Sequence, residues 1–443
     1  MSDDVHAQYA QKKMTYAELV RSLESPLTVA TGNASAKAHG FFFALGEHGD
    51  HIGEIVLGMT NTFEAEYPIY FRDGVQVRTA FYGPLERSLL KRGKSVAYRP
   101  TQFCDGKRFL DLNVPGPAVY VIVAGPMGDD GYFNLGLSAS LEYDSIQRYA
   151  PDPNTRIVIE ANRAMPHVLG LEAYGGHRFH ISQIDNVIES NEAIFELERQ
   201  TATESDQRMA DYVADLVEDG ATVQFGFGAL PDVVAERLKS KKELGIHTEM
   251  IGDGCMELIR SGAVTNEHKS EHRGISVATF AWGSQELYDW IDHNESVRLI
   301  PVGHVNFPPV LATQHKMTSI NSILQIDLRG QATAHCLNGK TYSGLGGHFE
   351  HTYGAQLSPG GKSILCLRSS AELSRGRVSN IMNQLAPGTA VTTPEFIIDW
   401  VVTEYGAVQL KWLSLQERAA ALISIAHPEF REELEKQARE MGP

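Results

Sequence analysis

The chain has 443 residues, of which 42% are hydrophobic and 21% are charged, a globular composition that excludes a disordered protein. Lys and Arg number 39 against 55 Asp and Glu, which gives a formal net charge of −16. This balance argues against a nucleic-acid binder and against adhesion to an anionic membrane. It still permits an anionic ligand held by backbone N–H groups and a few local cations. At about 100–200 residues per domain, the length predicts two or three domains.

The cysteines and the N-terminus indicate a reducing compartment. The four cysteines are widely spaced and include no C-x-x-C pair: Cys104, Cys255, Cys336 and Cys366. We therefore expect reduced thiols and no zinc or redox centre, and the histidines also lack metal-binding spacing. The first residues, MSDDVHAQYAQKKM, are polar, and the most apolar stretch, 118–127, is too short to span a membrane. We expect a cytoplasmic protein that binds neither a metal nor a membrane.

Short apolar runs alternate with helical patterns along the chain. Runs of this kind are typical of buried strands in parallel sheets, and the alternation predicts an α/β fold. The predicted strands are Ala118–Ala124, Arg156–Glu160, Val223–Phe227, Val297–Pro301 and Lys362–Leu367. The predicted helices are Asp211–Glu218, Asp232–Lys241 and a C-terminal amphipathic helix at His427–Met441.

The polar segment Glu196–Gln207 has no periodic apolar positions and is interpreted as the link between two halves. This interpretation predicts an N-terminal domain at 1–203 and a C-terminal domain at 204–443. The halves show no clear sequence repeat, so any duplication would be structural only.

A G-x-G turn lies between a predicted strand and a predicted helix. Gly226-Phe227-Gly228 follows the strand, and Pro231-Asp232 opens the helix. Such a turn suits the approach of an anionic ligand to a helix N-terminus, but a tight turn without a ligand fits the pattern equally well. Because Pro231 stands where the dinucleotide fingerprint needs its third glycine, a nicotinamide or flavin cofactor is disfavoured.

Two further segments carry residues suited to covalent chemistry. Glu249 ends a short run and precedes a Gly-x-Gly turn, so it is either a carboxylate nucleophile at a strand end or an ordinary turn residue. Gly346 and Gly347 lie in the glycine-rich segment Ser343–Lys362. This segment is either a nest of N–H groups for an oxyanion or phosphate, or a surface loop.

Several motifs in fixed order resemble one family. They are Gly125–Met127, Gly131–Gly136, Ile157–Pro166, Gly226–Asp232, Leu244–Met250, Ser261–Asn266, Ser319–Asp327, Ser343–Gly347, Val401–Gly406 and Glu417–Pro428. Together they resemble the acetyl-CoA hydrolase/transferase family of class I CoA-transferases. Within that family the chain is similar to enzymes that act on 4-hydroxybutyrate or on butyrate and acetate.

The resemblance implies a fold and a chemistry. It implies two tandem domains of similar open, mainly parallel-sheet fold, with Glu249 as the catalytic nucleophile. The carboxylate would pass through an acyl anhydride and a glutamyl-CoA thioester, with coenzyme A as substrate and no metal. Gly346 and Gly347 match the oxyanion and thioester segment. The positions that match CoA contacts are Gly226, Phe227, Gly228, Ala229, Leu230, Asn321 and Lys362.

One segment departs from the family pattern. Where relatives are expected to carry Gln, Phe and Arg, this chain has His348, His351 and Tyr353, which we assign to the substrate pocket. Loss of the arginine removes a fixed cation and a fork for a carboxylate, so the acceptor acid is expected to differ.

The expected function is transfer of CoA from an acyl-CoA to a small carboxylic acid. An acyl-CoA hydrolase that uses the same nucleophile is the alternative, and a non-catalytic acyl-CoA sensor is the second. The resemblance also implies a homodimer or homotetramer.

Overall fold

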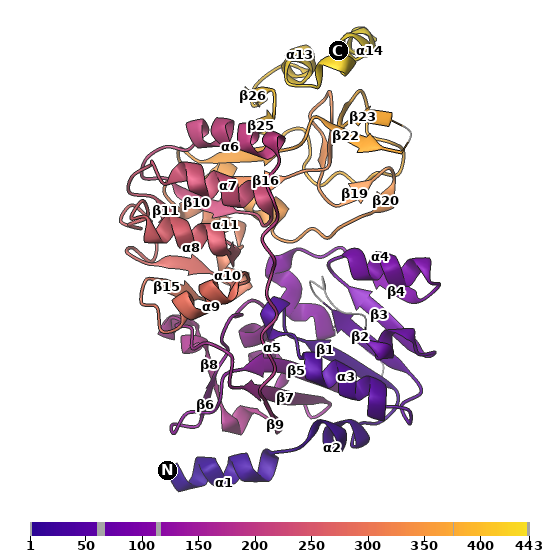
Figure 1. Cartoon of the computed structure of the whole chain (residues 1–443), viewed down its shortest axis with the longest axis vertical. Coiled ribbons are helices and arrows are strands. Elements are labelled where there is room, and N and C mark those ends of the chain that lie inside the picture. Colours follow the sequence, from indigo (N-terminus) through magenta and orange to yellow (C-terminus); the bar gives the residue numbers. More distant parts are fainter. Residues whose placement is uncertain (1, 60–66, 112–116, 375, 441–443) are drawn as a thin grey trace. The chain divides into compact units, whose positions relative to one another are not determined.

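A computed structural model describes residues 2–59, 67–111, 117–374 and 376–440 (Figure 1). They form two compact units, Met1–Leu197 with Val277–His304, and Glu198–Ser276 with Val305–Pro443. These units are not the continuous halves 1–203 and 204–443, because the segment at 277–304 belongs to the first unit. Backbone hydrogen bonds tie it there: the Ala281 N–H donates to Leu137 O (2.8 Å), and the Ala139 N–H donates to Thr279 O (2.9 Å).

The first unit is built on a seven-stranded parallel sheet. Its spatial order is β4 (Ser95–Tyr98), β3 (Val75–Thr79), β2 (Ile55–Met59), β1 (Leu27–Thr31), β5 (Ala118–Ala124), β7 (Thr155–Asn162) and β9 (Asn186–Ser190). The chain winds outward from β1 in one direction and from β5 in the other, so the sheet is doubly wound. The strand expected at Ala118–Ala124 is β5, and the one expected at Arg156–Glu160 lies within β7.

Smaller elements surround this sheet. The α-helices are α1 (Ser2–Lys12), α2 (Tyr16–Arg21), α3 (His39–His48), α4 (Pro84–Lys91), α5 (Glu142–Tyr149), α9 (Gln285–Ile291) and α10 (Val302–Val305). The two-stranded pairs are β6 (Tyr132–Asn134) with β8 (Arg178–His180), and β13 (Ser276–Ala278) with β15 (Val297–Leu299). The strand expected at Val297–Pro301 is therefore β15, which lies outside the main sheet.

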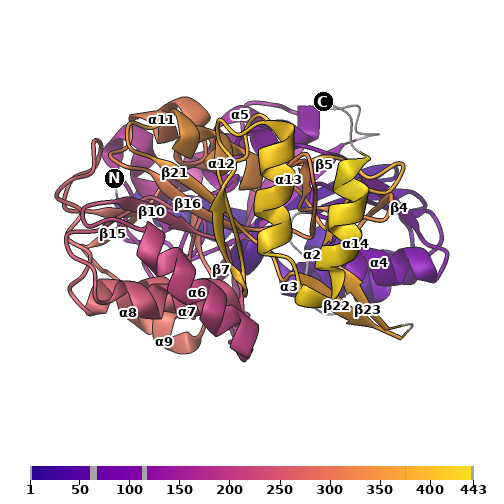
Figure 2. The same ribbon diagram turned by 90° about the horizontal axis from the view of Figure 1, so that it is seen from above.

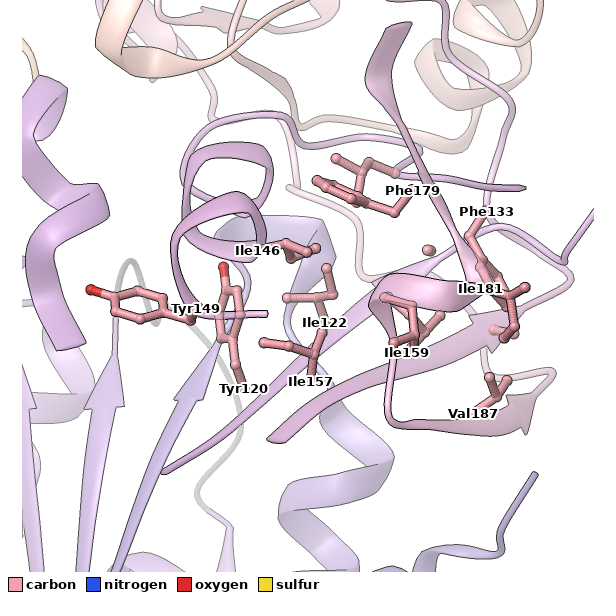
Figure 3. Packing of buried hydrophobic residues seen from close by; sticks show 14 of the residues in the cluster. Tyr120, Ile122, Phe133, Ile146, Tyr149, Ile157, Ile159, Phe179, Ile181 and Val187 are labelled. Atoms are coloured by element: carbon pink, nitrogen blue, oxygen red, sulfur yellow. The ribbon is translucent and has the colours of Figure 1, made fainter. Parts of the chain in front are cut away.

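Apolar side chains from the sheet pack beneath α5. Figure 3 shows Ile122 of β5 and Ile157 and Ile159 of β7 close to Ile146 of α5. All four side chains are fully buried, and burying each such side chain stabilises the fold by about 1.5–3 kcal/mol. The uninterrupted apolar sequence of β5 reflects burial on both faces of the sheet.

The second unit has a six-stranded sheet in the order β11 (Gly245–Ile246), β10 (Thr222–Phe225), β16 (Thr318–Ser322), β21 (Lys362–Cys366), β25 (Trp400–Thr403) and β26 (Gly406–Gln409). All pairs are parallel except β25 with β26. From β10 the chain goes to β11 on one side and then to β16 on the other. The winding direction therefore reverses between β10 and β16, where open α/β sheets place their ligands, outside the carboxyl ends of the strands.

Helices cover both faces of this second sheet. Figure 2 shows α6 (Glu204–Leu216), α7 (Ala229–Leu238) and α8 (Asp253–Arg260) on one face, with α11 (Pro308–Thr313) and α12 (His348–Leu357) on the other. The chain ends in α13 (Leu415–Ser424) and α14 (Pro428–Arg439). Short strands complete the unit: β17 (Gln325–Asp327), β18 (Ala332–Thr333), β19 (Cys336–Leu337), β20 (Lys340–Thr341), β22 (Ser370–Leu373), β23 (Gly376–Ser379) and β24 (Ile381–Met382). The helix expected at His427–Met441 is α14, and Met441 lies outside the described residues.

The polar segment Glu196–Gln207 is partly helical. Residues 191–203 are irregular, but α6 begins at Glu204. Thr203 and Asp206 form its capping box, in which the Thr203 side chain accepts from the Asp206 N–H and the Asp206 carboxylate accepts from the Thr203 N–H. Some of the polar residues that were interpreted as a linker therefore form the start of a helix. Polar side chains at that position accept hydrogen bonds from free backbone N–H groups. The fold class expected from the sequence, two mainly parallel α/β sheets, is confirmed.

Candidate active site

Three consecutive residues connect a short strand to two other segments of the second unit. His247 donates from Nε2 to Val305 O (2.9 Å). The Thr248 hydroxyl contacts both the N–H and the carbonyl of Phe225, each at 3.3 Å. Glu249 follows, with its carboxylate Oε2 2.6 Å from Asn306 Nδ2. His247 and Thr248 are fully buried, so they fix the backbone that carries Glu249.

The Glu249 carboxylate lies in a partly buried polar site. The pKa of Glu249 is raised from 4.5 to about 7, chiefly by burial and in smaller part by the nearby charge of Glu350. Hydrogen bonds from Asn306 and from the Gly347 backbone act in the opposite direction. The carboxylate is therefore poorly solvated but correctly oriented, which is the environment of a nucleophile or a general base near neutral pH.

The start of α12 contacts this carboxylate directly. Gly346 has a positive φ of +50°, which lets the chain turn into the helix, and Gly347 is its N-cap residue. A Cβ atom on Gly347 would overlap both Glu249 Oε2 and Asn306 Nδ2. Glycine is needed at 347 because the carboxylate approaches the backbone closely, not because of its φ of −95°. The N-terminus of α12 thus provides donors and a favourable dipole for an anion.

The two histidines of α12 are buried and uncharged. His348 Nε2 bonds the Thr393 hydroxyl (2.9 Å), and His351 Nδ1 bonds Gly347 O (2.9 Å). Burial lowers the pKa of each imidazole to about 4. His351 lies beside the Glu249 site, since its Nδ1 would be 3.0 Å from a Cβ on Gly347. Tyr353 is more exposed, at 38%, and stacks on Phe349 with ring centroids 5.9 Å apart.

A pocket of about 320 Å³ lies where the winding of the second sheet reverses. Its walls come from the carboxyl ends of three neighbouring strands and from α6. They include Phe227, Gly228, Ala229 and Leu230 after β10, Ser322, Ile323 and Leu324 after β16, and Leu367 and Arg368 after β21. Gly228 has a φ of +114°, a conformation that favours glycine. The G-x-G turn therefore lines a pocket of the size that ligands use.

The predicted residues occupy four different places in the second unit. Glu249, Gly346 and Gly347 lie together, and Phe227, Gly228, Ala229 and Leu230 line the pocket, whereas Gly226 does not. Asn321 pairs with Gln224 through two side-chain amide hydrogen bonds, at 3.0 and 3.3 Å, and so joins β16 to β10. Lys362 lies neither beside Glu249 nor in the lining of the pocket. Its Nζ bonds Glu218 Oε1 (2.7 Å) and Leu216 O (2.8 Å) at the amino end of β21.

Sequence reasoning missed Asn306 and Glu350. Asn306 is fully buried inside an apolar stretch, Val305-Asn306-Phe307, just before the prolines that open α11. A lone polar residue in such a stretch is a weak signal of a buried hydrogen bond. Glu350 is also fully buried, on the first turn of α12, and its charge reaches Glu249.

Among the described residues, no helix combines the length and apolar character that a membrane crossing needs.

Comparison with known proteins identifies the family. The profile described as "Acetyl-CoA hydrolase/transferase C-terminal domain" matches residues 283–438. A 4-hydroxybutyrate coenzyme A transferase from Clostridium kluyveri is 35% identical, over 96% of this chain and 97% of its own. A butyryl-CoA:acetate CoA-transferase from Anaerostipes caccae is 34% identical, over 80% of this chain and 79% of its own.

A solved structure agrees with these relatives. The crystal structure of RipA from Yersinia pestis superposes with a TM-score of 0.87 at 35% identity, covering 99% of both chains. The similarity to the Clostridium kluyveri enzyme extends through both units, so it is not confined to the C-terminal profile. The chain therefore belongs to the acetyl-CoA hydrolase/transferase family and is an acyl-CoA:carboxylate CoA-transferase.

Proposed function

We propose that this enzyme moves CoA from an acyl-CoA to a small carboxylic acid of the acetate, butyrate or 4-hydroxybutyrate type, through a glutamyl-CoA thioester on Glu249. The observation that carries the proposal is the Glu249 carboxylate, partly buried and held through Oε2 by Asn306 and the start of α12. The substrate class rests on the names of the relatives.

The first half of the reaction loads CoA onto the enzyme. The Glu249 carboxylate attacks the thioester carbonyl of the acyl-CoA, and the tetrahedral intermediate expels CoA thiolate to leave a mixed anhydride. The thiolate then attacks the Glu249 carbonyl of that anhydride and expels the first carboxylate. The product is a glutamyl-CoA thioester, which preserves the thioester energy.

The second half reverses these steps with a new acid. The acceptor carboxylate attacks the glutamyl thioester and expels CoA thiolate, which then attacks the acyl carbonyl of the new anhydride. This releases the new acyl-CoA and restores the Glu249 carboxylate. Every bond broken is matched by one formed, so the cycle requires no oxidant or reductant, and a cycle without a metal is part of the proposal.

The hydrogen-bond donors around Glu249 Oε2 can stabilise the negative charge that develops on this oxygen during the reaction. When the Glu249 carbonyl is attacked, its oxygen becomes an oxyanion. Asn306 Nδ2 and the Gly346-Gly347 backbone at the start of α12 supply donors for it without rearrangement. The raised pKa of Glu249 leaves about half of the enzyme ionised near pH 7, and the ionised half is the nucleophile.

An intact-mass experiment tests the proposal. Incubation with acetyl-CoA or butyryl-CoA without acceptor is expected to add a mass equal to CoA minus one water, and Glu249→Gln is expected to abolish it. The adduct should be discharged by acetate, butyrate or 4-hydroxybutyrate. Absence of any adduct, with Glu249→Ala and the parent behaving alike, would support the sensor alternative.

Acceptor dependence separates transferase from hydrolase. The description of the matching family includes hydrolases, and they would share the same nucleophile. In the proposed reaction CoA leaves the enzyme only as the new acyl-CoA, so turnover requires an acceptor acid and releases no free CoA. Release at the full rate with no acceptor would assign the chain to hydrolysis. The expected homodimer or homotetramer and the cytoplasmic location stay predictions.

A further inference from the structure

The proposed function leaves one question open: which cation meets the phosphates of CoA in an enzyme of net charge −16. Sequence reasoning selected Lys362. The register of β16 and β21 argues against it, because Lys362 pairs with Thr318 at the amino end, whereas Cys366 and Ser322 pair at the pocket end. Four residues of strand separate the two ends by about 13 Å.

Lys362 is also neutralised where it lies. Its Nζ and that of Lys316 both contact the Glu218 carboxylate at 2.7 Å. Hydrogen bonds from Lys316 and Lys362 lower the pKa of Glu218 to about 2. This cluster is complete without a ligand.

We propose that Arg368 is the cation that binds the phosphates of CoA. Its side chain lines the pocket beside the Phe227–Leu230 loop, and among the described residues the only other charged one in the lining is Asp206. The inference rests on the proposed function, since it assumes that CoA occupies this pocket.

The structure holds Arg368 in place through one end of its guanidinium. Nη2 lies 2.9 and 3.2 Å from the two oxygens of the Asp206 carboxylate, which is nearly buried and also accepts from Thr203. Asn380 Nδ2 donates to Arg368 O (2.8 Å) and fixes the backbone. Among the described residues, Arg368 Nε and Nη1 make no hydrogen bond, and the side chain is 53% exposed. Two donor groups thus remain for a phosphate.

The same pocket leads toward the nucleophile. Its Phe227–Leu230 wall follows β10 directly, and Phe225 at the end of β10 holds Thr248, the neighbour of Glu249. Phe227 is 47% exposed, which provides an apolar surface for the ligand. A ligand with its phosphates at Arg368 would therefore lie against the segment that positions Glu249.

Binding measurements test the inference without turnover. Calorimetry would compare CoA, 3′-dephospho-CoA and pantetheine, of which pantetheine lacks the nucleotide phosphates. Arg368→Ala is expected to weaken CoA binding by roughly 10- to 100-fold, the effect of a charge-assisted hydrogen bond, and to leave pantetheine binding unchanged. Arg368→Lys should restore part of the loss, and the 3′-dephospho-CoA arm identifies which phosphate is bound.

One arginine variant and one lysine variant complete the design. Arg377→Ala removes the same charge from an exposed pair with Glu372 and is the matched control. Lys362→Ala is the competing arm. CoA binding at the parent affinity in Arg368→Ala, an equal loss for pantetheine, or a selective loss in Lys362→Ala would each overturn the inference. CoA binding that depends on Arg368 without a glutamyl adduct would support the inference and refute the proposed chemistry of Glu249.

Discussion

The raised pKa of Glu249 has a measurable effect on stability, which the Glu249→Gln variant isolates. The pKa of this carboxyl is 4.5 in its ordinary state and about 7 in the folded protein, mainly because of burial. Each pKa unit corresponds to about 1.4 kcal/mol, so the folded state is penalised by about 3 kcal/mol once the group is ionised.

The sign of the effect follows from proton binding. Below pH 4 the carboxyl is protonated in both states, and no penalty exists. Between pH 4.5 and 7 the unfolded chain loses its proton while the folded protein keeps it, so the stability of the parent falls as pH rises. Glutamine cannot ionise and does not share this loss. The stability of Glu249→Gln relative to the parent should rise by about 3 kcal/mol from pH 4 to pH 8.

Urea unfolding of the ligand-free proteins, with midpoint and slope measured at each pH, is the assay. The changed hydrogen bond to Asn306 adds a constant offset, so the rise with pH is the informative quantity. Glu435→Gln removes a carboxyl from an exposed position on α14 and is the control. A difference between Glu249→Gln and the parent that is flat from pH 4 to pH 8 would refute the reasoning from burial.

Three further variants probe the same site. Gly347→Ala should reduce kcat by at least about 100-fold with an unchanged circular dichroism spectrum, because the new Cβ overlaps Glu249 Oε2 and Asn306 Nδ2; near-parental kcat would contradict the close approach. Asn306→Ala should lower kcat by about 100- to 1,000-fold and shift the rise of kcat/KM to higher pH, since the lost hydrogen bond had lowered the pKa of Glu249; an unmoved pH profile would exclude this role. Glu350→Gln should shift that rise to lower pH, because the Glu350 charge raises the pKa of Glu249, and a shift upward would show that the sign is wrong.

The sequence predicted the architecture better than the site. The apolar run of β5 is buried on both faces, so its strand could be read directly from composition, and the resemblance led to Glu249. The two units could not be predicted, because hydrogen bonds such as that from Ala281 N–H to Leu137 O, which attach residues 277–304 to the first unit, join residues more than 100 positions apart. Local patterns carry no information about such contacts.

The sequence did not predict those site residues whose hydrogen-bond partners are far away along the chain. Asn306 is 57 positions from Glu249, and Arg368, the cation proposed for the CoA phosphates, is 162 from Asp206. Lys362 was selected because it follows two glycines, yet its place on β21 is set by strand register. In each case the chemistry of the side chain is visible in the sequence, but its position relative to the sheet ends is not.

In the altered first turns of α12, the two histidines contribute hydrogen bonds but no positive charge. Burial keeps His348 and His351 uncharged at neutral pH, and their hydrogen bonds to Thr393 and Gly347 make them part of the frame around Glu249. They therefore do not replace the positive charge of the arginine expected at Tyr353. No Lys or Arg occurs in His348–Leu357, and the helix carries one anion, Glu350. An acceptor acid that needs a fixed cation must find it on an element other than α12.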